Sequence, residues 1–520
     1  MMEDKKKFAL VIYLFSFLLS FIPALFLTAP QVEDALGTMG AAAYLTGHQW
    51  GPFLVEKGFY YKYGISELYL PVFLLARDPV LRYKLLLTIN SALMAFIPVM
   101  GYRIGEKHLG MMAEDAAAVS LIAGGMPSAL LYGKLTWAEP VLFTMPWVVI
   151  FVVLELAEGT ISGTRRRALS AALALATVFA FMSHQRGIVL IAAVCMLLAL
   201  VRIVYKVSLV DVVSFGVFLA AGLAIDRLLD SWTKNTVYLG AELKYNTLGH
   251  FLKPEVYGKL LSAKGLVFGL RTALGWLFNS AASGFGITLF GMVVCVSLGF
   301  GIRDVKGKLD KFKVIVLFGS LLYVGAFLLG MLFFSEDLYD YWAGINVYRC
   351  DHLVFGRYLE SVLPVMMYIG LVSLGRIGRK DEDLPEKKAL GILAGVTAGL
   401  MALLTAYFAV KIAPAMEGVD SYIHSLMSMN ICFDMSGVTL TQDVISNLPV
   451  ALVIFGAVSC VIFLICICLV FAPGRKFGIR PVYVILAVMF LYIYMRNMWD
   501  VLYRVDTCSL TEYARFYLTH

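Results

Sequence analysis

The sequence predicts an all-α, polytopic membrane protein with about thirteen transmembrane helices and membrane-parallel helices in its first outer loop. Of the 520 residues, 60% are hydrophobic and 15% are charged, and the mean hydropathy is +0.81. Soluble domains are about 45–50% apolar and about 25% charged. Many apolar runs also reach the ~20 residues that a helix needs to span a bilayer. The net charge of +7 comes from basic residues that recur between these runs, which is typical of inner-face loops and not of a nucleic-acid surface.

Basic residues divide the first half of the chain into seven spans. The lysines at 5–7 keep the N-terminus in the cytoplasm, because loops rich in Lys and Arg stay on that side. The apolar piece 65–76 has only twelve residues, so we expect it to lie on the outer face, with 77–84 also remaining outside. This assignment places the later basic clusters on the inner side together. The expected spans are residues 8–29, 85–104, 116–132, a fourth that ends at 156, 168–182, 187–204 and 210–228.

The same reasoning predicts six spans in the second half and an outer C-terminal tail. A long outer region, 231–282, contains an amphipathic piece, 260–278, that we expect to lie at the membrane interface. Two further outer loops are expected at 335–360 and 411–447, and the tail is 496–520. The expected spans are residues 283–301, 314–334, 361–374, 389–410, 448–471 and 481–494.

The stretch 30–71, directly after the first span, holds the residues best suited to chemistry. It opens with two adjacent acids, Glu33 and Asp34, and ends with an aromatic and basic cluster around Tyr61 and Lys62. A carboxylate held just outside the membrane can take a proton, and a nearby lysine can bind a phosphate. This combination indicates chemistry on a lipid-linked phosphate.

On these residues the sequence resembles the GT-C superfamily of membrane glycosyltransferases. The resemblance is to the branch that includes the protein mannosyltransferases and the transferases that decorate lipopolysaccharide. In that family an acidic residue or pair follows the first span, and the loop then runs through membrane-parallel helices to a Tyr-rich segment with a lysine. Glu33-Asp34 and Tyr60-Tyr61-Lys62 match this order, although Tyr63-Gly64 stands where the family usually has prolines.

The resemblance implies a function and a division of the chain. It implies transfer of a hexose or pentose, with inversion, from a polyprenyl-phosphate donor to a glycan or lipid acceptor of the cell envelope. The reaction would take place at the outer face of the cell membrane, with membrane lipid and no nucleic acid as partner. Residues 1–230 would form the catalytic membrane module, and residues 231–520 a more variable membrane module.

Asp34 is the expected general base, with Glu33 as the alternative. Transfer needs a group that takes the proton of the acceptor hydroxyl. Gly37 and Gly40 flank this carboxylate and would leave room for a sugar. An acid at this place would otherwise cap a helix N-terminus, which the helix dipole favours. The family resemblance favours the catalytic interpretation. Neighbouring residues point to different faces of a helix, so only one of the two acids is expected to act.

Glu139 is a second outer-face acid, in the short loop Thr-Trp-Ala-Glu-Pro before the fourth span. The resemblance places an acidic residue near the site in this second outer loop. Glu139 could bind the acceptor or a divalent metal, although no cofactor is certain. The structural alternative is a helix start, since Pro140 suits the first helical turn.

Lys62, Arg186 and Arg357 are the expected phosphate ligands, and Tyr61 and Tyr358 are expected to contact substrate. Arginine binds phosphate through two parallel hydrogen bonds. Counting the spans from the cytoplasmic N-terminus places Arg186 and Arg357 at the outer ends of spans, on the same side as Asp34. The alternative for Arg186 is that its side chain reaches out to the lipid headgroups.

The eight cysteines contain no Cys-x-x-Cys pair and no Cys/His ligand spacing. Three of them, Cys350, Cys432 and Cys508, fall in outer loops, where a disulfide would be compatible with the topology.

Two other classes of function compete with glycosyl transfer. A secondary transporter or lipid-glycan flippase is the main alternative, but the chain has no internal repeat and its charges gather at span ends and not at mid-span. A polymerase or ligase of lipid-linked oligosaccharides is the other.

Overall fold

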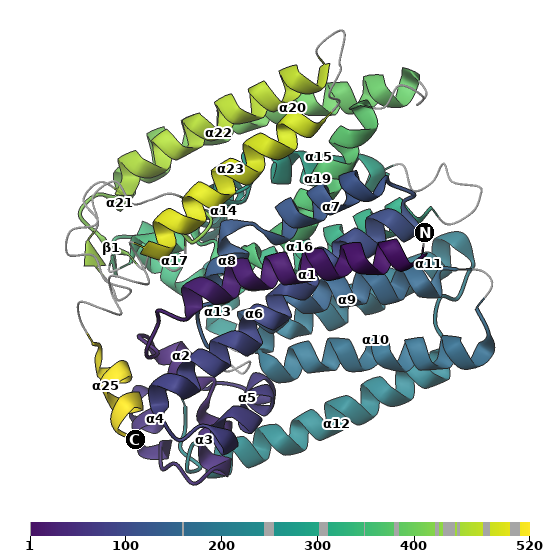
Figure 1. Cartoon of the computed structure of the whole chain (residues 1–520). Helices are drawn as coiled ribbons and strands as arrows, with labels where there is room; N and C mark the ends of the chain where they lie inside the picture. Colours follow the sequence, from purple (N-terminus) through teal and green to yellow (C-terminus); the bar gives the residue numbers. More distant parts are fainter. Residues whose placement is uncertain are drawn as a thin grey trace.

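The structure is a computed structural model of the whole chain, and its outline is a bundle of long, roughly aligned helices (Figure 1). The residues it describes are 2–158, 161–243, 254–300, 310–347, 349–378, 384–421, 426–429, 443–444, 448–471, 479–499 and 510–520.

Helices account for nearly all of the regular structure. In the first half they are α1 (Met2–Ala24), α2 (Glu33–Gly37), α3 (Gly40–Leu45), α4 (Gly51–Lys57), α5 (Gly64–Leu75), α6 (Pro79–Arg103), η1 (Ile104–His108), α7 (Ala113–Gly124), α8 (Pro127–Tyr132), α9 (Glu139–Leu156), α10 (Gly163–Ser183), η2 (Gln185–Gly187), α11 (Ile188–Tyr205) and α12 (Val212–Thr236). In the second half they are α13 (Pro254–Leu261), α14 (Ala263–Ala282), α15 (Ile287–Phe300), α16 (Lys311–Phe333), α17 (Ser335–Trp342), η5 (Cys350–Val354), α18 (Arg357–Glu360), α19 (Leu363–Gly378), α20 (Leu384–Tyr407), η6 (Phe408–Ile412), α21 (Ala413–Met416), α22 (Leu448–Phe471), α23 (Arg480–Asn497) and α25 (Glu512–Thr519). Two short strands, β1 (Asp420–Ser421) and β2 (Asp443–Val444), pair antiparallel.

The prediction of a polytopic all-α membrane protein is confirmed. In the described part of the chain, nine helices are long and apolar enough to cross a membrane, or ten if α14 and α15 count as one bent span. Each of the thirteen expected spans overlaps a helix in the described part of the chain. Those outside the nine fall on α7 with α8, on α15, on α19 and on α23.

Three expected element boundaries were wrong. The second span begins at Pro79 and not at 85, because Asp78 accepts a hydrogen bond from the Leu81 amide (2.7 Å) and so caps an earlier helix start. The third span is broken after Gly124, and α8 starts afresh at Pro127. The first expected span, 8–29, is too long, because α1 ends at Ala24. The expected interfacial piece 260–278 lies largely in α14, which joins α15 at a bend of 114°, and its position at the membrane interface stays a prediction.

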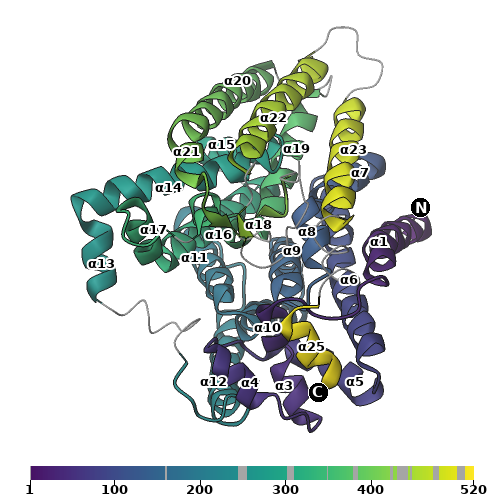
Figure 2. The same ribbon diagram turned by 90° about the vertical axis from the view of Figure 1, so that its left-hand side faces the viewer.

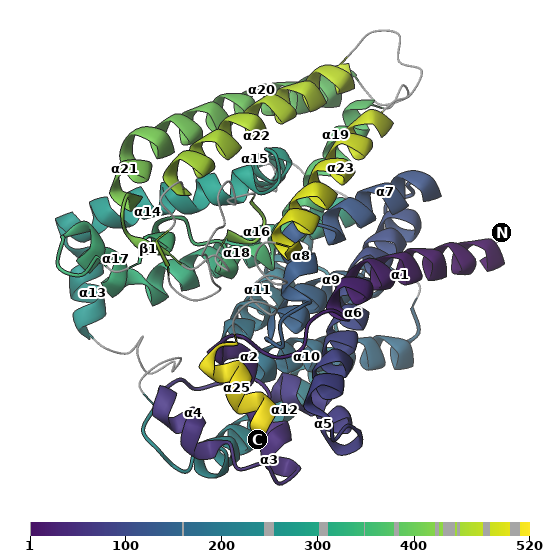
Figure 3. The same ribbon diagram turned by 60° about the vertical axis from the view of Figure 1, so that its left-hand side comes forward.

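The loop after α1 folds into four short helices, α2 to α5, at one end of the bundle, and the twelve-residue apolar helix α5 confirms the expected short element. The C-terminal helix α25 packs on these helices, as Figures 2 and 3 show. The rings of Phe516 and Phe53 stack at 4.1 Å between centroids, and Thr511 donates a hydrogen bond to the Gln31 carbonyl (2.9 Å). The C-terminal end of the chain therefore lies at the same end of the bundle as the first loop.

Residues expected on the inner side meet at the opposite end of the bundle. Glu155 pairs with Lys107 and with Arg165 (2.5 Å), and Lys311 lies 3.3 Å from Glu158. The predicted grouping of these charges on one side is thus confirmed, whereas the direction in which that side faces stays a prediction.

Of the three cysteines for which a disulfide would be compatible with the topology, Cys432 and Cys508 lie outside the described residues. Cys350 is buried, and its Sγ lies 3.6 Å from the Val419 carbonyl oxygen.

Cysteine labelling tests the direction of the bundle. A cysteine at Gln49, which is exposed in the first loop, should react with a membrane-impermeant thiol reagent in intact cells. A cysteine at Thr164, exposed at the opposite end, should react only after lysis. The parent protein gives the background from native cysteines. The reverse pattern would mean that the whole topology is inverted.

Candidate functional site

Glu139 lies at the centre of a cluster of charges at the first-loop end of the bundle. Its side chain is fully buried at the start of α9. Its Oε1 accepts hydrogen bonds from Arg186 Nη2 (2.5 Å) and Arg357 Nε (2.7 Å). Its Oε2 is buried and has no hydrogen-bond partner within the described residues. Because an unpaired buried acceptor is costly, Oε2 is suited to accept a hydrogen bond from a ligand.

Asp34 joins the same cluster through Arg357. Its Oδ2 accepts a hydrogen bond from Arg357 Nη1, and its Oδ1 accepts one from the Tyr61 hydroxyl (2.7 Å). The N-cap position of α2 belongs to Val32, so Asp34 is not the cap itself, but it lies in the first helical turn, where the helix dipole favours an acid. Its side chain is 24% exposed, which leaves this carboxylate accessible from outside the bundle.

The two arginines are held together although they come from distant parts of the chain. Arg186 is in η2 between α10 and α11, and its Nη1 donates to the Arg357 carbonyl (3.0 Å). Its side chain is only 8% exposed, so it does not extend to lipid headgroups. The Arg357 guanidinium lies over the Trp137 ring, with Cζ 3.9 Å from the centroid. Neighbouring carboxylates raise the pKa of Arg357 despite its burial, so it stays cationic.

Helix α2 is fastened to the loop that carries Trp137. Thr38 Oγ1 donates to the Thr136 carbonyl, and Thr136 Oγ1 donates to the Ala35 carbonyl (2.8 Å). These reciprocal bonds fix the first outer loop against the second. The distance between the carboxylates of Asp34 and Glu139 is therefore set by backbone and not by flexible side chains alone.

We expected Gly37 to leave room for a sugar, but the space beside it is filled. A Cβ atom at Gly37 would lie 2.0 Å from Tyr61 Cδ2. The tyrosine ring therefore lies directly against the glycine, and this contact carries its hydroxyl to Asp34. Gly40 packs against Leu54 instead.

Lys62 lies outside the cluster. Its Nζ binds both carboxylate oxygens of Asp226 on α12 (2.7 and 2.9 Å) and lies 3.7 Å from the centroid of the Phe181 ring. The Tyr63 hydroxyl donates to the same aspartate (3.1 Å). This buried pair fastens the first loop to α12, and it leaves the arginines as the cations beside Asp34.

Glu33 points away from the cluster, toward α25, with Lys57, Glu512 and Tyr513 around it. Burial, and next the charge of Asp34, raise the pKa of Glu33 to about 8. At neutral pH this group is mostly protonated, so it cannot accept a proton as Asp34 can.

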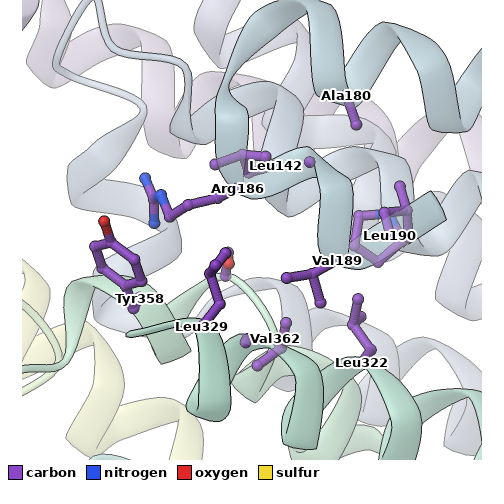
Figure 4. Close-up of a pocket in the computed structure, with 13 residues that line it drawn as sticks. Leu142, Ala180, Arg186, Val189, Leu190, Leu322, Leu329, Tyr358 and Val362 are labelled. Atoms are coloured by element: carbon purple, nitrogen blue, oxygen red, sulfur yellow. The ribbon is translucent and has the colours of Figure 1, made fainter. Parts of the chain in front are cut away.

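An apolar pocket leads away from Arg186 and Tyr358 into the bundle. It is a narrow cavity of about 30 Å³, bordered by α9, α10 and α11 on one side and by α16 and the turn after α18 on the other. Figure 4 shows Arg186 and Tyr358 at one end and Leu190 and Leu322 at the other. The Arg186 Cζ lies 4.8 Å from the centroid of the Tyr358 ring. The pocket thus combines a cationic end with an apolar body.

One group in the described part of the chain has a spacing that suits a metal ion, namely His108, Glu155 and Glu158 at the opposite end of the bundle. Lys107 and Lys311 already contact these carboxylates. At the cluster itself, arginine nitrogens contact Glu139 Oε1 and Asp34 Oδ2.

Three neighbours of the cluster were not among the expected site residues. Trp137 stacks on Arg357, and His184 Nδ1 accepts a hydrogen bond from the Arg186 amide (3.1 Å). Glu360 is buried one turn after Arg357 and accepts a hydrogen bond from the Ser428 amide (3.0 Å). Burial raises the pKa of Glu360 to about 7. Only the closeness of Trp137 and His184 to predicted site residues could have suggested them.

No family model and no curated protein matches the sequence. Among solved structures, the chain is similar to ArnT from Cupriavidus metallidurans in the apo state, with a TM-score of 0.48 and 14% identity over 96% of this chain and 77% of that one. It is also similar to the same protein bound to undecaprenyl phosphate, with a TM-score of 0.46 and 14% identity over 97% of this chain and 77% of that one.

Removing the Glu139 carboxylate should strongly destabilise the protein. Glu139→Ala leaves buried Arg186 without its carboxylate partner and Arg357 with Asp34 alone, and breaking a buried ion pair typically costs about 3–5 kcal/mol. Thermal unfolding in detergent measures the effect. Glu114→Ala is the matched control, because its pair with Arg480 is exposed and such pairs contribute about 0–1 kcal/mol. Equal, small shifts for both variants would contradict a structural role for Glu139.

Proposed function

We propose that the protein is a glycosyltransferase that moves a monosaccharide from a polyprenyl-phosphate donor to a glycan or lipid acceptor of the cell envelope. One observation carries the proposal: a single guanidinium, that of Arg357, contacts both Asp34 and Glu139. The proposed base, Asp34, is therefore in direct contact with Arg357, the cation proposed to bind the leaving phosphate. The sequence resemblance to GT-C glycosyltransferases supports the same reaction.

The side chains that line the cavity beside Arg186 are of the kinds that suit a lipid-phosphate donor. A polyprenyl phosphate has a charged head and a long apolar tail, and the pocket has a cationic end and an apolar body. Arg186 and Arg357 would bind the phosphate with charge-assisted hydrogen bonds, which are stronger than neutral ones. Without phosphate, the two carboxylates of the cluster neutralise the charges of its two arginines. An incoming phosphate would therefore compete with Asp34 for Arg357.

This competition gives the order of events. The phosphate takes the Nη1 end of Arg357, while Nε stays on Glu139. The Asp34 oxygen that Arg357 held is then free to approach the acceptor hydroxyl. Tyr61 still holds the other oxygen, so the orientation of the carboxylate is kept.

The reaction is a single displacement at the anomeric carbon. The acceptor oxygen forms its bond to that carbon, and the bond from the carbon to the phosphate oxygen breaks. The proton passes to Asp34, and the configuration inverts because the attack comes from the face opposite the phosphate. The phosphodiester, with one negative charge, becomes a phosphate monoester with up to two. Fixed cations stabilise this growing charge.

Asp34→Asn should keep the fold and lose transfer. The amide has the same shape but cannot take the proton, so turnover should fall by about 10²–10⁴-fold. Glu33→Gln is the matched control, because Glu33 is mostly protonated and faces α25, and it should retain most activity. The assay follows sugar transfer from a polyprenyl-phosphate donor by purified protein. Normal turnover by Asp34→Asn together with a loss of turnover by Glu33→Gln would mean that Glu33, and not Asp34, is the general base.

Arg357 should be needed for donor binding. Arg357→Ala should weaken binding of the polyprenyl-phosphate sugar in nanodiscs, and Arg357→Lys should restore only part of it, since the planar fork is lost. Arg186→Ala should behave like Arg357→Ala. Size-exclusion profiles and thermal unfolding verify the fold of each variant. Unchanged donor affinity in all three folded variants would mean that the donor phosphate does not bind at these arginines.

A further inference from the structure

A second pocket lies at the first-loop end of α12, away from the charge cluster. It has a volume of about 380 Å³ between α3, α5 and α12, which come together at the lower edge of Figure 1. Its walls are mostly apolar and include Ala42 and Leu45 of α3 and Leu229 and Trp232 of α12. Ser66 and Glu67 of α5 provide its polar side. Nothing in the proposed transfer reaction uses this pocket.

Glu67 differs from the other carboxylates nearby because it lacks a counter-charge. Asp226 is paired with Lys62, and Asp230 accepts a bond from Lys234 (2.7 Å). In the described part of the chain, no side chain forms an ion pair or hydrogen bond with the Glu67 carboxylate. Glu67 is exposed at the pocket rim, and desolvation by the neighbouring protein raises the pKa of its carboxyl, which agrees with a carboxylate that has no cation beside it. The pocket therefore has an unmatched negative group at its rim.

The position of the pocket suits a lipid. Helix α12 has many exposed apolar side chains, such as Val217 and Leu228, as expected for a helix that faces the bilayer. Near its end the Trp232 and Tyr44 rings meet edge to face at 5.8 Å, and such aromatic rings are enriched at the headgroup level. An apolar volume at that level is readily filled by lipid.

We propose that this pocket binds a membrane lipid whose headgroup ends in a primary ammonium. The ammonium would bind the Glu67 carboxylate and lie against the Trp232 ring, which combines an ion pair with a cation–π contact. The apolar part of the lipid would cover Leu45 and Leu229. A sugar fits less well, because its several hydroxyls would meet one available carboxylate among apolar walls.

Such a lipid would add to the contacts that already hold the first loop against α12, among them the Tyr44–Trp232 ring contact. In addition, the Tyr60 hydroxyl donates to Asp230 and Lys62 binds Asp226. A lipid between α3 and α12 would fill the pocket beside these contacts. Because a ligand that binds only the folded state stabilises it, the lipid should also raise the unfolding temperature.

Lipid retention by the purified full-length protein tests the proposal without any turnover, so the result is independent of the transfer reaction. The probes are phosphatidylethanolamine, phosphatidylcholine and phosphatidylglycerol, compared by native mass spectrometry and thermal unfolding. Phosphatidylethanolamine should bind about five- to tenfold more tightly than phosphatidylglycerol, from one ion pair and one cation–π contact. Phosphatidylcholine should fall between them, because its quaternary ammonium cannot donate a hydrogen bond to Glu67.

Glu67→Gln should remove most of this preference, and Trp232→Leu should weaken binding of both ammonium lipids. Glu56→Gln is the matched control, since it removes one negative charge from an exposed position of the same loop and should leave the preference intact. Equal retention of phosphatidylglycerol, or an unchanged preference in Glu67→Gln, would overturn the proposal. So would Glu67-dependent binding of soluble phosphoethanolamine as tight as that of the lipid, because the apolar walls would then contribute nothing.

Discussion

The arrangement at the first-loop end depends on one buried carboxylate between two arginines. Arg186 and Arg357 lie at helix ends in a largely apolar bundle, and each is almost withdrawn from solvent. Neither could stay there as a cation without a counter-charge, because desolvating an unpaired charge is very costly. Glu139 supplies that charge to both through one oxygen. The position of η2 relative to α18 therefore follows from the start of α9.

The first outer loop is built around this centre by contacts that regular helix packing does not provide. The reciprocal threonine bonds fix α2 to the loop before α9. The pair of Lys62 with Asp226 fixes the far side of the loop to α12, and α25 covers it from outside. Short helices of five to seven residues are marginal by themselves, so tertiary contacts must hold them. Asp34 thus owes its orientation to several distant elements.

The two carboxylate contacts of Arg357 differ in how exposed they are to solvent. Arg357 spans two carboxylates, of which Glu139 is fully buried and Asp34 is partly exposed. In the proposed reaction, an anionic ligand entering from the exposed side would displace the Asp34 contact first, because Asp34 is the more exposed of the two carboxylates. The unpartnered Oε2 of Glu139 adds an acceptor within the described residues, and the narrow cavity beside Arg186 adds an apolar lining. The separate pocket with Glu67 carries an unmatched negative group, so it calls for a ligand of opposite sign.

The sequence by itself determined the class, the approximate spans and the end of the bundle at which each charged residue lies. These follow from local properties, since a segment's hydrophobicity decides whether it crosses and the basic residues beside it decide its direction. Hence Asp34, Glu139, Arg186 and Arg357 could be assigned to one end before any fold was known.

Only the tertiary structure decided which of these residues meet. Asp34 pairs with Arg357 across 323 positions, and the equally plausible Lys62 pairs with Asp226 instead. The ring of Tyr61 fills the space that Gly37 was expected to leave open. Partner choice depends on how helices hundreds of residues apart pack and rotate against each other, and no local pattern in the sequence records that packing.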